Sequence, residues 1–315
     1  MLNVEVAQSG LFDESSRHGR LLEYSLLASD RDVSDMKTAV KNLLQYADGI
    51  EGLYLNLAFG SHCWDLLNPT WRPEELVPFT TLATDQLSMP ASQGDVFIWL
   101  HSADAELIPQ AVINVYPVMK PVALLQLDVA GIKNKQSRDL IGFVDGTANA
   151  KDDKRLPIAL IPEGKVGAGG SYVISQRWQH DLEKFNGLAI PEQEKVVGRT
   201  KDENVELEGD AMPEDSHVSR TDAKVEGVGM KIYRRSYPYM ASQLSATSHG
   251  RNKKPDNGLY FLAFACEMQR FTVQLDRMMG LSPDGINDKL MQFSQVRNSS
   301  YWFMPSANDL ALVLK

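Results

Sequence analysis

Cysteine is scarce in this chain. Only Cys63 and Cys266 occur among its 315 residues. They lie far apart, each inside an apolar, strand-like run, so they form neither a metal-ligand pattern nor a disulfide framework. We therefore expect two buried free thiols in a protein that works in a reducing compartment.

Positive charge is also in short supply. The chain has 32 Lys and Arg residues against 41 Asp and Glu residues, which gives a net charge of -9. A phosphate backbone needs a basic surface for binding. The composition therefore argues against nucleic acid as a partner.

Long hydrophobic runs are missing as well. No stretch approaches the roughly 18 apolar residues that a membrane-spanning helix requires. The first ten residues contain neither a hydrophobic export segment nor a twin-arginine pair. We expect a cytoplasmic protein without a membrane segment, long enough to form one large domain or two of ordinary size.

The order of predicted elements occurs twice. In the first half, the hydrophobic pattern predicts strands at 20–28, 52–60, 95–100 and 122–127, and helices at 33–47 and after residue 103. In the second half, it predicts strands at 171–177, 230–236, 258–265 and 300–304, and helices at 180–186 and after residue 267.

Each half therefore has the order β-α-β-β-α-β, which is the split-βαβ or ferredoxin-like unit. This is an α+β arrangement of antiparallel strands with both helices on one face. We expect an N-terminal domain at 1–135 and a C-terminal domain at 136–315. Since one face of each sheet is left bare, the two sheets either pack on each other or bury that face against a ligand.

A small turn with one carboxylate lies where the halves meet. Residues 141–147 read Ile-Gly-Phe-Val-Asp-Gly-Thr, so Asp145 stands between two glycines, Gly142 and Gly146. Taken alone, an Asp-Gly pair is more often an ordinary turn than a catalytic acid.

Two further motifs follow in the second half. Residues 215–220 read Asp-Ser-His-Val-Ser-Arg and contain His217, and residues 231–236 read Lys-Ile-Tyr-Arg-Arg-Ser and contain Arg234. Taken alone, His217 could be an ordinary surface histidine. Arg234 could likewise be a strand-edge residue that pairs with a carboxylate. One imidazole, one acid and one guanidinium together are the set that a haem peroxidase needs.

In combination these motifs resemble the dye-decolourising peroxidase family, whose members carry a Gly-x-x-Asp-Gly turn, a later proximal histidine and a distal arginine soon after it. The resemblance covers nearly the whole chain, because the predicted elements fall in the family's order. It implies duplicated ferredoxin-like domains with one haem b per chain in the C-terminal half. It also implies a homo-oligomer that reduces hydrogen peroxide and oxidises dyes, phenolics or other organic donors in one-electron steps.

The resemblance assigns a role to each motif. His217 is expected to be the axial ligand of the haem iron. Asp145 is expected to move the peroxide proton, and Arg234 to stabilise charge on the departing oxygen. Arg235 must point to the opposite side of a strand, so only one of the two arginines can serve, and the spacing from His217 favours Arg234.

Further contacts with the haem follow from the same resemblance. The expected cofactor-binding residues are Gly146, Thr147, Ala148, His217, Arg234 and Ser236. The glycines of the Asp145 turn would let the backbone approach a flat macrocycle, and Ser236 would order a distal water.

The chain departs from the family pattern at two places. Relatives continue with Glu-Asn-Pro where this chain has Ala148-Asn149-Ala150, and we expect this to alter an access edge more than the chemistry. Some relatives have asparagine at the position of Ser236, which leaves the role of the serine open. Asp276 is one candidate to accept a hydrogen bond from the second nitrogen of His217, the alternative being a structural salt bridge.

Two other functions stay open. Some relatives have been proposed to remove iron from haem and leave the porphyrin intact, and a non-enzymatic haem carrier would have little use for Asp145 and Arg234 together. His180 is expected to be structural. The tryptophans are expected mainly in the core, and none of them can be selected as an electron relay.

Overall fold

The computed structural model describes residues 3–27, 33–240 and 255–315. The principal elements of the first half are β1 (His18–Leu26), α1 (Val33–Asp48), β2 (Leu53–Phe59), α2 (Ser61–Leu67), β3 (Leu82–Ala83), β4 (Ser88–Met89), β5 (Val96–Ser102), α3 (Leu107–Met119) and β6 (Ala123–Ile132). Those that follow are η1 (Asp152–Arg155), α4 (Leu156–Ala159), β7 (Ser171–His180), α5 (Leu182–Asn186), α6 (Ile190–Val197), η2 (Gly209–Ala211), α7 (His217–Thr221), β8 (Lys224–Val225), β9 (Val228–Gly229), β10 (Tyr233–Arg234), β11 (Tyr237–Met240), β12 (Asn257–Ala265), α8 (Gln269–Met279), η3 (Lys289–Gln292), β13 (Ser294–Met304) and α9 (Ala307–Val313).

The first half folds as its hydrophobic pattern predicts. Its strands lie in the order β6-β1-β5-β2 and pair antiparallel throughout. Helix α1 buries one stripe of apolar side chains that includes Met36, Val40 and Leu43, as the 3.6-residue period requires. The strand predicted at 20–28 is β1, and its predicted last residue lies outside the described residues.

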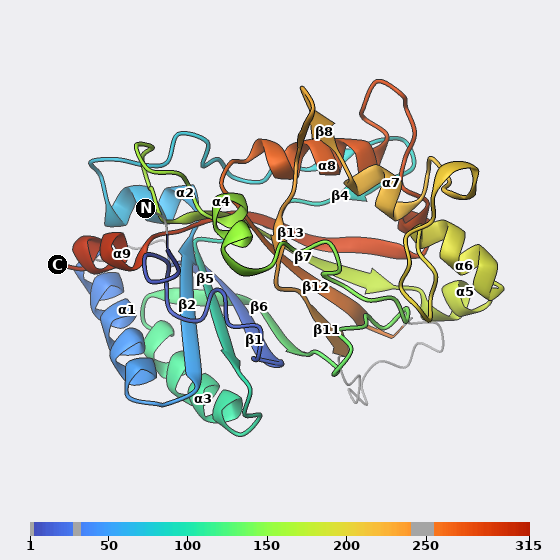
Figure 1. The fold of residues 1–315 in the computed structure, drawn as a ribbon. Helices are drawn as coiled ribbons and strands as arrows, with labels where there is room; N and C mark the ends of the chain where they lie inside the picture. The colour runs from blue at the N-terminus through green and yellow to red at the C-terminus, as the bar shows by residue number, and fades with distance from the viewer. Residues whose placement is uncertain (1–2, 28–32, 241–254) are drawn as a thin grey trace.

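The second half repeats this topology with a larger insertion. Its strands lie in the order β13-β7-β12-β11, again antiparallel. Three short helices, α5 to α7, replace one helix after β7, and they gather at one end of the molecule (Figure 1). The predicted α+β class with duplicated ferredoxin-like units is therefore confirmed.

The two sheets turn their inner faces toward each other. Large aromatic side chains from both halves fill the space between the sheets, including Trp99 from β5 and Tyr260 from β12. The edges of the sheets meet in single residue pairs, Tyr239 with Gly131 and Phe303 with Phe59. Of the two arrangements left open by the sequence, the inner faces adopt sheet-on-sheet packing.

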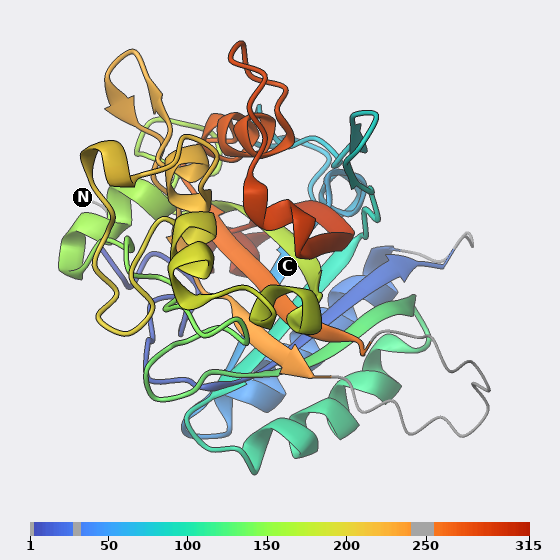
Figure 2. The same cartoon turned by 90° about the vertical axis from the view of Figure 1, so that its right-hand side faces the viewer.

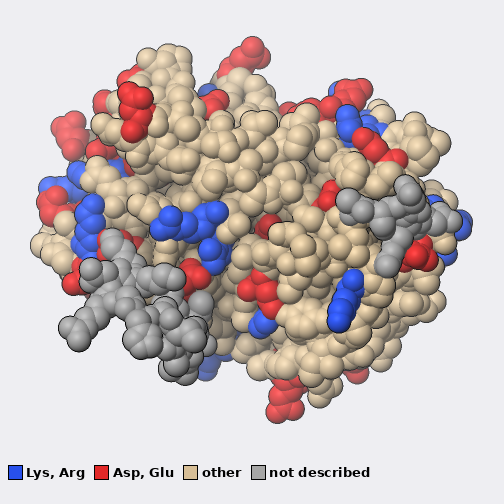
Figure 3. Space-filling model, turned by 180° about the vertical axis from the view of Figure 1, so that it is seen from behind, with Lys and Arg blue, Asp and Glu red and all other residues tan. Residues whose placement is uncertain are grey.

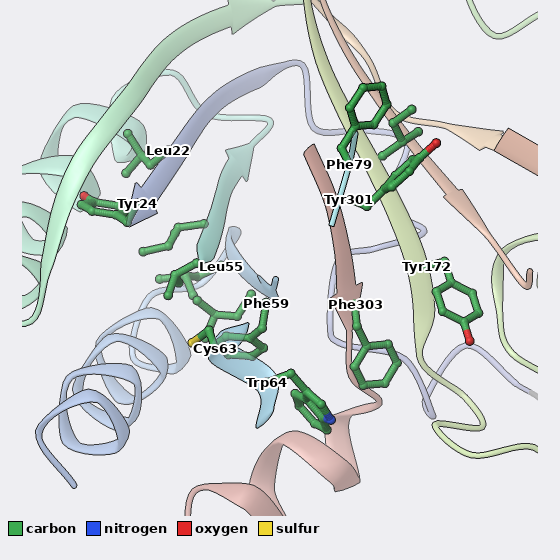
Figure 4. Close-up of a cluster of buried hydrophobic side chains, with 14 of the residues drawn as sticks. Leu22, Tyr24, Leu55, Phe59, Cys63, Trp64, Phe79, Tyr172, Tyr301 and Phe303 are labelled. Atoms are coloured by element: carbon green, nitrogen blue, oxygen red, sulfur yellow. The ribbon is translucent and has the colours of Figure 1, made fainter. Parts of the chain in front are cut away.

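The outer faces are covered by helices. Helices α1 and α3 lie over the first sheet and α8 over the second, on opposite sides of the paired sheets (Figures 1 and 2). Figure 4 shows part of this core, where Trp64 of α2 packs edge-on against Phe303 with ring centroids 4.8 Å apart. Cys63 is buried here and Cys266 is half-buried, and both thiols are free.

Basic and acidic side chains are interspersed over the face of the molecule shown in Figure 3. Among the described residues, no helix is both long and apolar enough to cross a membrane.

Candidate functional site

A large cavity lies against the outer face of the second sheet. It encloses about 990 Å³ of space, part of it open to solvent. Alternate residues of β7 and β12 form one wall, α8 forms another, and most of the lining is apolar. The polar side chains on its wall are Asp139, Asp145, Gln176, His180, His217, Thr221, Arg234, Gln274, Asp288 and Ser294.

His217 reaches this cavity from the first position of α7. The helix begins here because the hydroxyl of Ser216 caps it and accepts a hydrogen bond from the backbone N–H of Ser219. The imidazole Nδ1 lies 2.6 Å from a carboxylate oxygen of Asp288, whose side chain is fully buried. This contact sets the ring orientation and leaves Nε2 for a ligand.

The partner of His217 is not the candidate Asp276. Asp276 lies on α8, whereas the carboxylate beside the imidazole is Asp288, at the start of the short helix η3. The second oxygen of Asp288 accepts a hydrogen bond from the backbone N–H of Leu290. The carboxylate is therefore held from two directions.

Arg220 fixes α7 to the rest of the second half. Its buried guanidinium makes a two-pronged contact with the carboxylate of Asp284, at 2.9 and 3.0 Å, and donates to the backbone carbonyl of Arg277. The same contacts hold the pKa of Asp284 well below its usual range, mainly through the hydrogen bonds from Arg220. Sequence reasoning used this arginine only as part of a motif.

Asp145 lies on a loop that is tied down at both sides. Its backbone N–H donates to the carbonyl of Ser137 at 2.9 Å, and Arg138 donates to the carbonyl of Gly142 at 2.8 Å. Gly142 has a φ of +92°, and a Cβ there would come within 2.6 Å of the side chain of Lys201. The positive φ favours glycine at this position, and contact with a macrocycle is not needed to explain it.

Arg234 and Arg235 point in opposite directions, as expected of adjacent strand residues. The Nε of Arg234 lies 3.5 Å from a carboxylate oxygen of Asp145, and both side chains line the cavity. Arg235 turns into the inter-sheet core, donates to the backbone carbonyls of Leu11 and Asp13, and lies over the ring of Trp99. The choice between the two arginines therefore agrees with the geometry.

Asn149 joins the Asp145 loop to the strand of Arg234. Its amide nitrogen donates to the carbonyl of Arg234 at 2.8 Å, and its amide oxygen accepts from the N–H of Arg234 at 3.0 Å. This reciprocal pair fixes the distance between the acid and the guanidinium. The sequence showed only that the neighbours of Asn149 differ from the family pattern.

A second, polar cavity adjoins the first and shares Asp145 and Arg234 with it. It encloses about 620 Å³, and Gly146, Ser236 and Lys133 are among its lining residues. Burial and the nearby Arg235 guanidinium lower the pKa of Lys133 to about 7. The buried Ser236 hydroxyl makes no hydrogen bond to the described residues, so it can bond to a water or ligand here.

The remaining predicted contacts lie further out. Thr147 and Ala148 are exposed, and neither is among the lining residues of the two cavities. Thr147 instead accepts a hydrogen bond from Asn204 at 2.8 Å. The contact of these two residues with a cofactor stays a prediction.

His180 is held at both ring nitrogens. Nε2 lies 2.9 Å from a carboxylate oxygen of Asp139, and Nδ1 lies 2.6 Å from the hydroxyl of Ser294. The ring is buried in the cavity wall, and each of its nitrogens has a polar neighbour. This agrees with the structural role expected for it.

Comparison with known proteins gives a consistent result. The chain matches the family models for the N-terminal part of Dyp-type peroxidases at residues 18–131 and for the C-terminal part at residues 136–309. A curated "Dye-decolorizing peroxidase" from Rhodococcus erythropolis is 31% identical over 82% of this chain and 74% of its own length. A curated "Deferrochelatase" from Yersinia pseudotuberculosis is 24% identical over 66% of this chain and 54% of its own length.

Solved structures give the same family. DyPB from Rhodococcus jostii RHA1 superposes with a TM-score of 0.88 at 29% identity and covers 98% of both chains. The resemblance inferred from the motifs is therefore confirmed, and the chain belongs to the Dyp-type peroxidase family.

Proposed function

We propose that this protein is a haem-dependent peroxidase that reduces hydrogen peroxide and oxidises dyes, phenolics or other organic donors in one-electron steps. The observation that carries the proposal is one apolar cavity that brings together His217, backed by Asp288, and the pair of Asp145 and Arg234. Variants of the similar Rhodococcus jostii RHA1 protein have been solved in complex with haem.

The residues present fit a haem b group. The cavity is of the size and apolar character that a large planar ligand needs. His217 offers one imidazole nitrogen toward it while the buried Asp288 holds the other. The adjoining polar cavity, with Lys133, Arg234 and Ser236 on its wall, suits the carboxylate edge of such a ligand.

His217 would hold the iron, and Asp288 would make the imidazole more electron-rich and favour the oxidised metal. When bound, the haem supplies the oxidising chemistry. The role of this histidine and carboxylate is thus to orient and tune the cofactor.

Asp145 and Arg234 would act on the peroxide. A carboxylate in the cavity wall can take a proton from one peroxide oxygen and return it to the other. A guanidinium offers several N–H donors and a positive charge, so it can stabilise negative charge on the departing oxygen. Their mutual contact at 3.5 Å, fixed through Asn149, keeps both groups on the same part of the wall.

Two rival functions are weaker. The Yersinia relative carries the name "Deferrochelatase", and it is less similar than the Rhodococcus erythropolis peroxidase and covers less of the chain. A haem carrier gives no reason for the paired acid and guanidinium. Gly146, Thr147, Ala148 and Ser236 are proposed as further contacts of the haem or of an ordered water.

The proposal also covers the location of the protein, its oligomeric state, its partners and its domain boundary. We place the protein in the cytoplasm as a homo-oligomer, with no nucleic-acid or membrane partner. A boundary near 135/136 between an N-terminal unit (1–135) and a C-terminal, haem-binding unit (136–315) is supported by the ranges of the two family models.

The test is a stopped-flow absorption experiment on the haem-loaded protein, mixed first with hydrogen peroxide and then with a reducing dye. We expect a rapid Soret change that the dye reverses. His217→Ala should lose or displace the haem, whereas Asp145→Asn and Arg234→Leu should keep it and slow the change, roughly 100-fold for a lost proton-transfer group. The exposed residues His62, Asp65 and Arg72 supply matched controls as His62→Ala, Asp65→Asn and Arg72→Leu.

A Soret band that ignores peroxide would overturn the proposal. Iron-free porphyrin as the product would establish the iron-removing activity instead. A normal axial spectrum in His217→Ala would refute the ligand assignment, and unchanged rates in both Asp145→Asn and Arg234→Leu would refute the proposed roles of those two side chains.

A further inference from the structure

A buried carboxylate lies in the inter-sheet core, where the proposed peroxide chemistry does not use it. Glu23 of β1 is 2% exposed, and its side chain accepts hydrogen bonds from three hydroxyl groups. Tyr260 donates at 2.6 Å, Ser175 at 3.0 Å and Ser300 at 3.5 Å. Within the described residues no Lys or Arg forms an ion pair with it.

Such an arrangement is costly for a purely structural group. An ionised carboxylate loses much of its hydration on burial, and neutral hydroxyl donors compensate only in part. The amide oxygen of a glutamine could accept from Tyr260 and Ser175, and the side chain would carry no charge. Burial raises the pKa of Glu23 to about 7, so the group can change its protonation state near neutral pH.

The Glu23 cluster lies directly behind the wall of the proposed haem cavity. Leu259 and Phe261 of β12 line the cavity, so Tyr260 between them points to the opposite face of the sheet. Ser175 lies in the same way between two cavity-lining residues of β7. The phenol ring is therefore separated from the cavity by the backbone of one sheet.

Other aromatic groups join the same cluster. The ring of Phe97 is stacked on that of Tyr260, with centroids 6.3 Å apart and planes 6° apart, and also on Trp302 at 5.6 Å. The indole nitrogen of Trp302 donates to the hydroxyl of Ser175 at 2.9 Å. The N–H of Trp302 therefore donates to a neutral hydroxyl, whereas the O–H of Tyr260 donates to a carboxylate, which is the stronger base.

Tyr260 differs from the other tyrosines that contact carboxylates. Tyr239 donates to Asp256, which is paired with Arg177, and Tyr233 donates to Glu14, which lies within 4 Å of Lys151 and Arg155. A carboxylate already paired with a cation is a weaker base. Glu23 forms no ion pair with a described Lys or Arg, which favours it as a proton acceptor.

A phenol gives up an electron more readily when a base within hydrogen-bond reach takes its proton at the same time. We propose that Tyr260 is a redox-active tyrosine: it gives one electron to the peroxide-oxidised haem and its phenolic proton to Glu23. The O–H bond of Tyr260 breaks and one forms on Glu23, which leaves a neutral tyrosyl radical beside a neutral carboxylic acid. One electron from an organic donor and return of the proton restore the pair. This inference rests on the proposed peroxidase function.

The reaction should be favoured where Glu23 is ionised. The charged and titratable groups that act on Glu23 are Tyr260 from β12 and Arg177 from β7, together with the Ser175 and Ser300 hydroxyls. On the neighbouring strands, Phe97 of β5 and Leu127 of β6 lie opposite it, and neither titrates. We therefore expect more radical at pH 8 than at pH 6.

The test is electron paramagnetic resonance of the haem-loaded protein, frozen at intervals after mixing with peroxide and without a donor. We expect a neutral tyrosyl signal that narrows when the protein is made with ring-deuterated tyrosine. Tyr260→Phe should abolish this signal. Glu23→Gln should slow its formation roughly 100-fold, the loss typical of a positioned base. Tyr239→Phe, in the same core but facing an ion-paired carboxylate, is the matched control and should keep the signal.

The possible failures can be told apart. If the wild-type Soret band does not respond to peroxide, the proposed function fails and this inference fails with it. If the Soret response is normal but the signal persists in Tyr260→Phe, forms at the wild-type rate in Glu23→Gln, or does not narrow with labelled tyrosine, only the assignment of Tyr260 and Glu23 is overturned. The labelling experiment uses the unaltered chain, so a signal that does not narrow overturns the assignment even where a variant does not fold.

Discussion

Replacement of Glu23 by glutamine should increase the free energy of unfolding, and by an amount that grows with pH. In the folded protein burial raises the pKa of this carboxyl from 4.5 to about 7. The folded state therefore holds the proton more tightly than the unfolded chain does between these pH values. The protonated carboxyl makes its full favourable contribution to the free energy of unfolding below pH 4.5. This contribution is lost as the pH rises through 7.

The gap between these pKa values corresponds to about 3 kcal/mol of stability. Glutamine does not titrate, so Glu23→Gln should match the wild type near pH 4.5 and exceed it by up to about 3 kcal/mol at pH 8. The amide can accept from Tyr260 and donate to a serine hydroxyl, so the hydrogen bonds of the site need not be lost.

The assay is urea denaturation of wild type and variant, equally loaded with haem, followed by circular dichroism at several pH values between 4.5 and 8. Glu51→Gln, at an exposed position, controls for the loss of a negative charge. Parallel pH profiles for wild type and Glu23→Gln would refute the reasoning, because they would mean that Glu23 titrates as an ordinary exposed carboxyl.

Two further predictions concern the supports of the site. Asp288→Asn should keep the haem but shift its reduction potential to more positive values, because the imidazole loses the carboxylate that makes it electron-rich. A spectroelectrochemical titration measures this, and an unchanged potential would contradict the role of Asp288. Asn149→Ala should leave haem affinity unchanged and slow the Soret response to peroxide severalfold, because the acid and the guanidinium are no longer held together. An unaltered rate in stopped flow would show that the two hydrogen bonds between Asn149 and Arg234 are not needed for the reaction with peroxide.

The repeated fold was accessible to sequence reasoning because its helices and strands have clear periods. The stripe on α1 and the apolar runs of β5 and β12 required no long-range information. The meeting of the two sheets was different. The same alternation of apolar and polar residues suits a sheet that packs on another sheet and a sheet that packs on a ligand. The structure shows that the inner faces pack on each other and that the cavity lies on an outer face.

The sequence predicted the residues that line the site, but not the residues that hold them in place. His217, Asp145 and Arg234 carry recognisable local sequence, and they do line one cavity. Asp288 has no local signal, because it lies 71 residues from His217 and reaches the imidazole through tertiary packing. Asp276 was a candidate because it lies on a predicted helix, and the sequence does not show how far a side chain on that helix lies from the imidazole.

Two adjacent arginines at the end of the very short strand β10 make its register decisive. β10 pairs with β12 through two residue pairs, Tyr233 with Phe264 and Arg234 with Ala263. A slip of one residue would turn Arg235 toward the cavity and bury Arg234 against Trp99. The two hydrogen bonds between Asn149 and Arg234 form only when β10 is paired with β12 in the observed register. The same holds for the hydrogen bonds from Arg235 to backbone carbonyls. The segment thus tolerates changes of side chain more readily than the gain or loss of a single residue between 230 and 236.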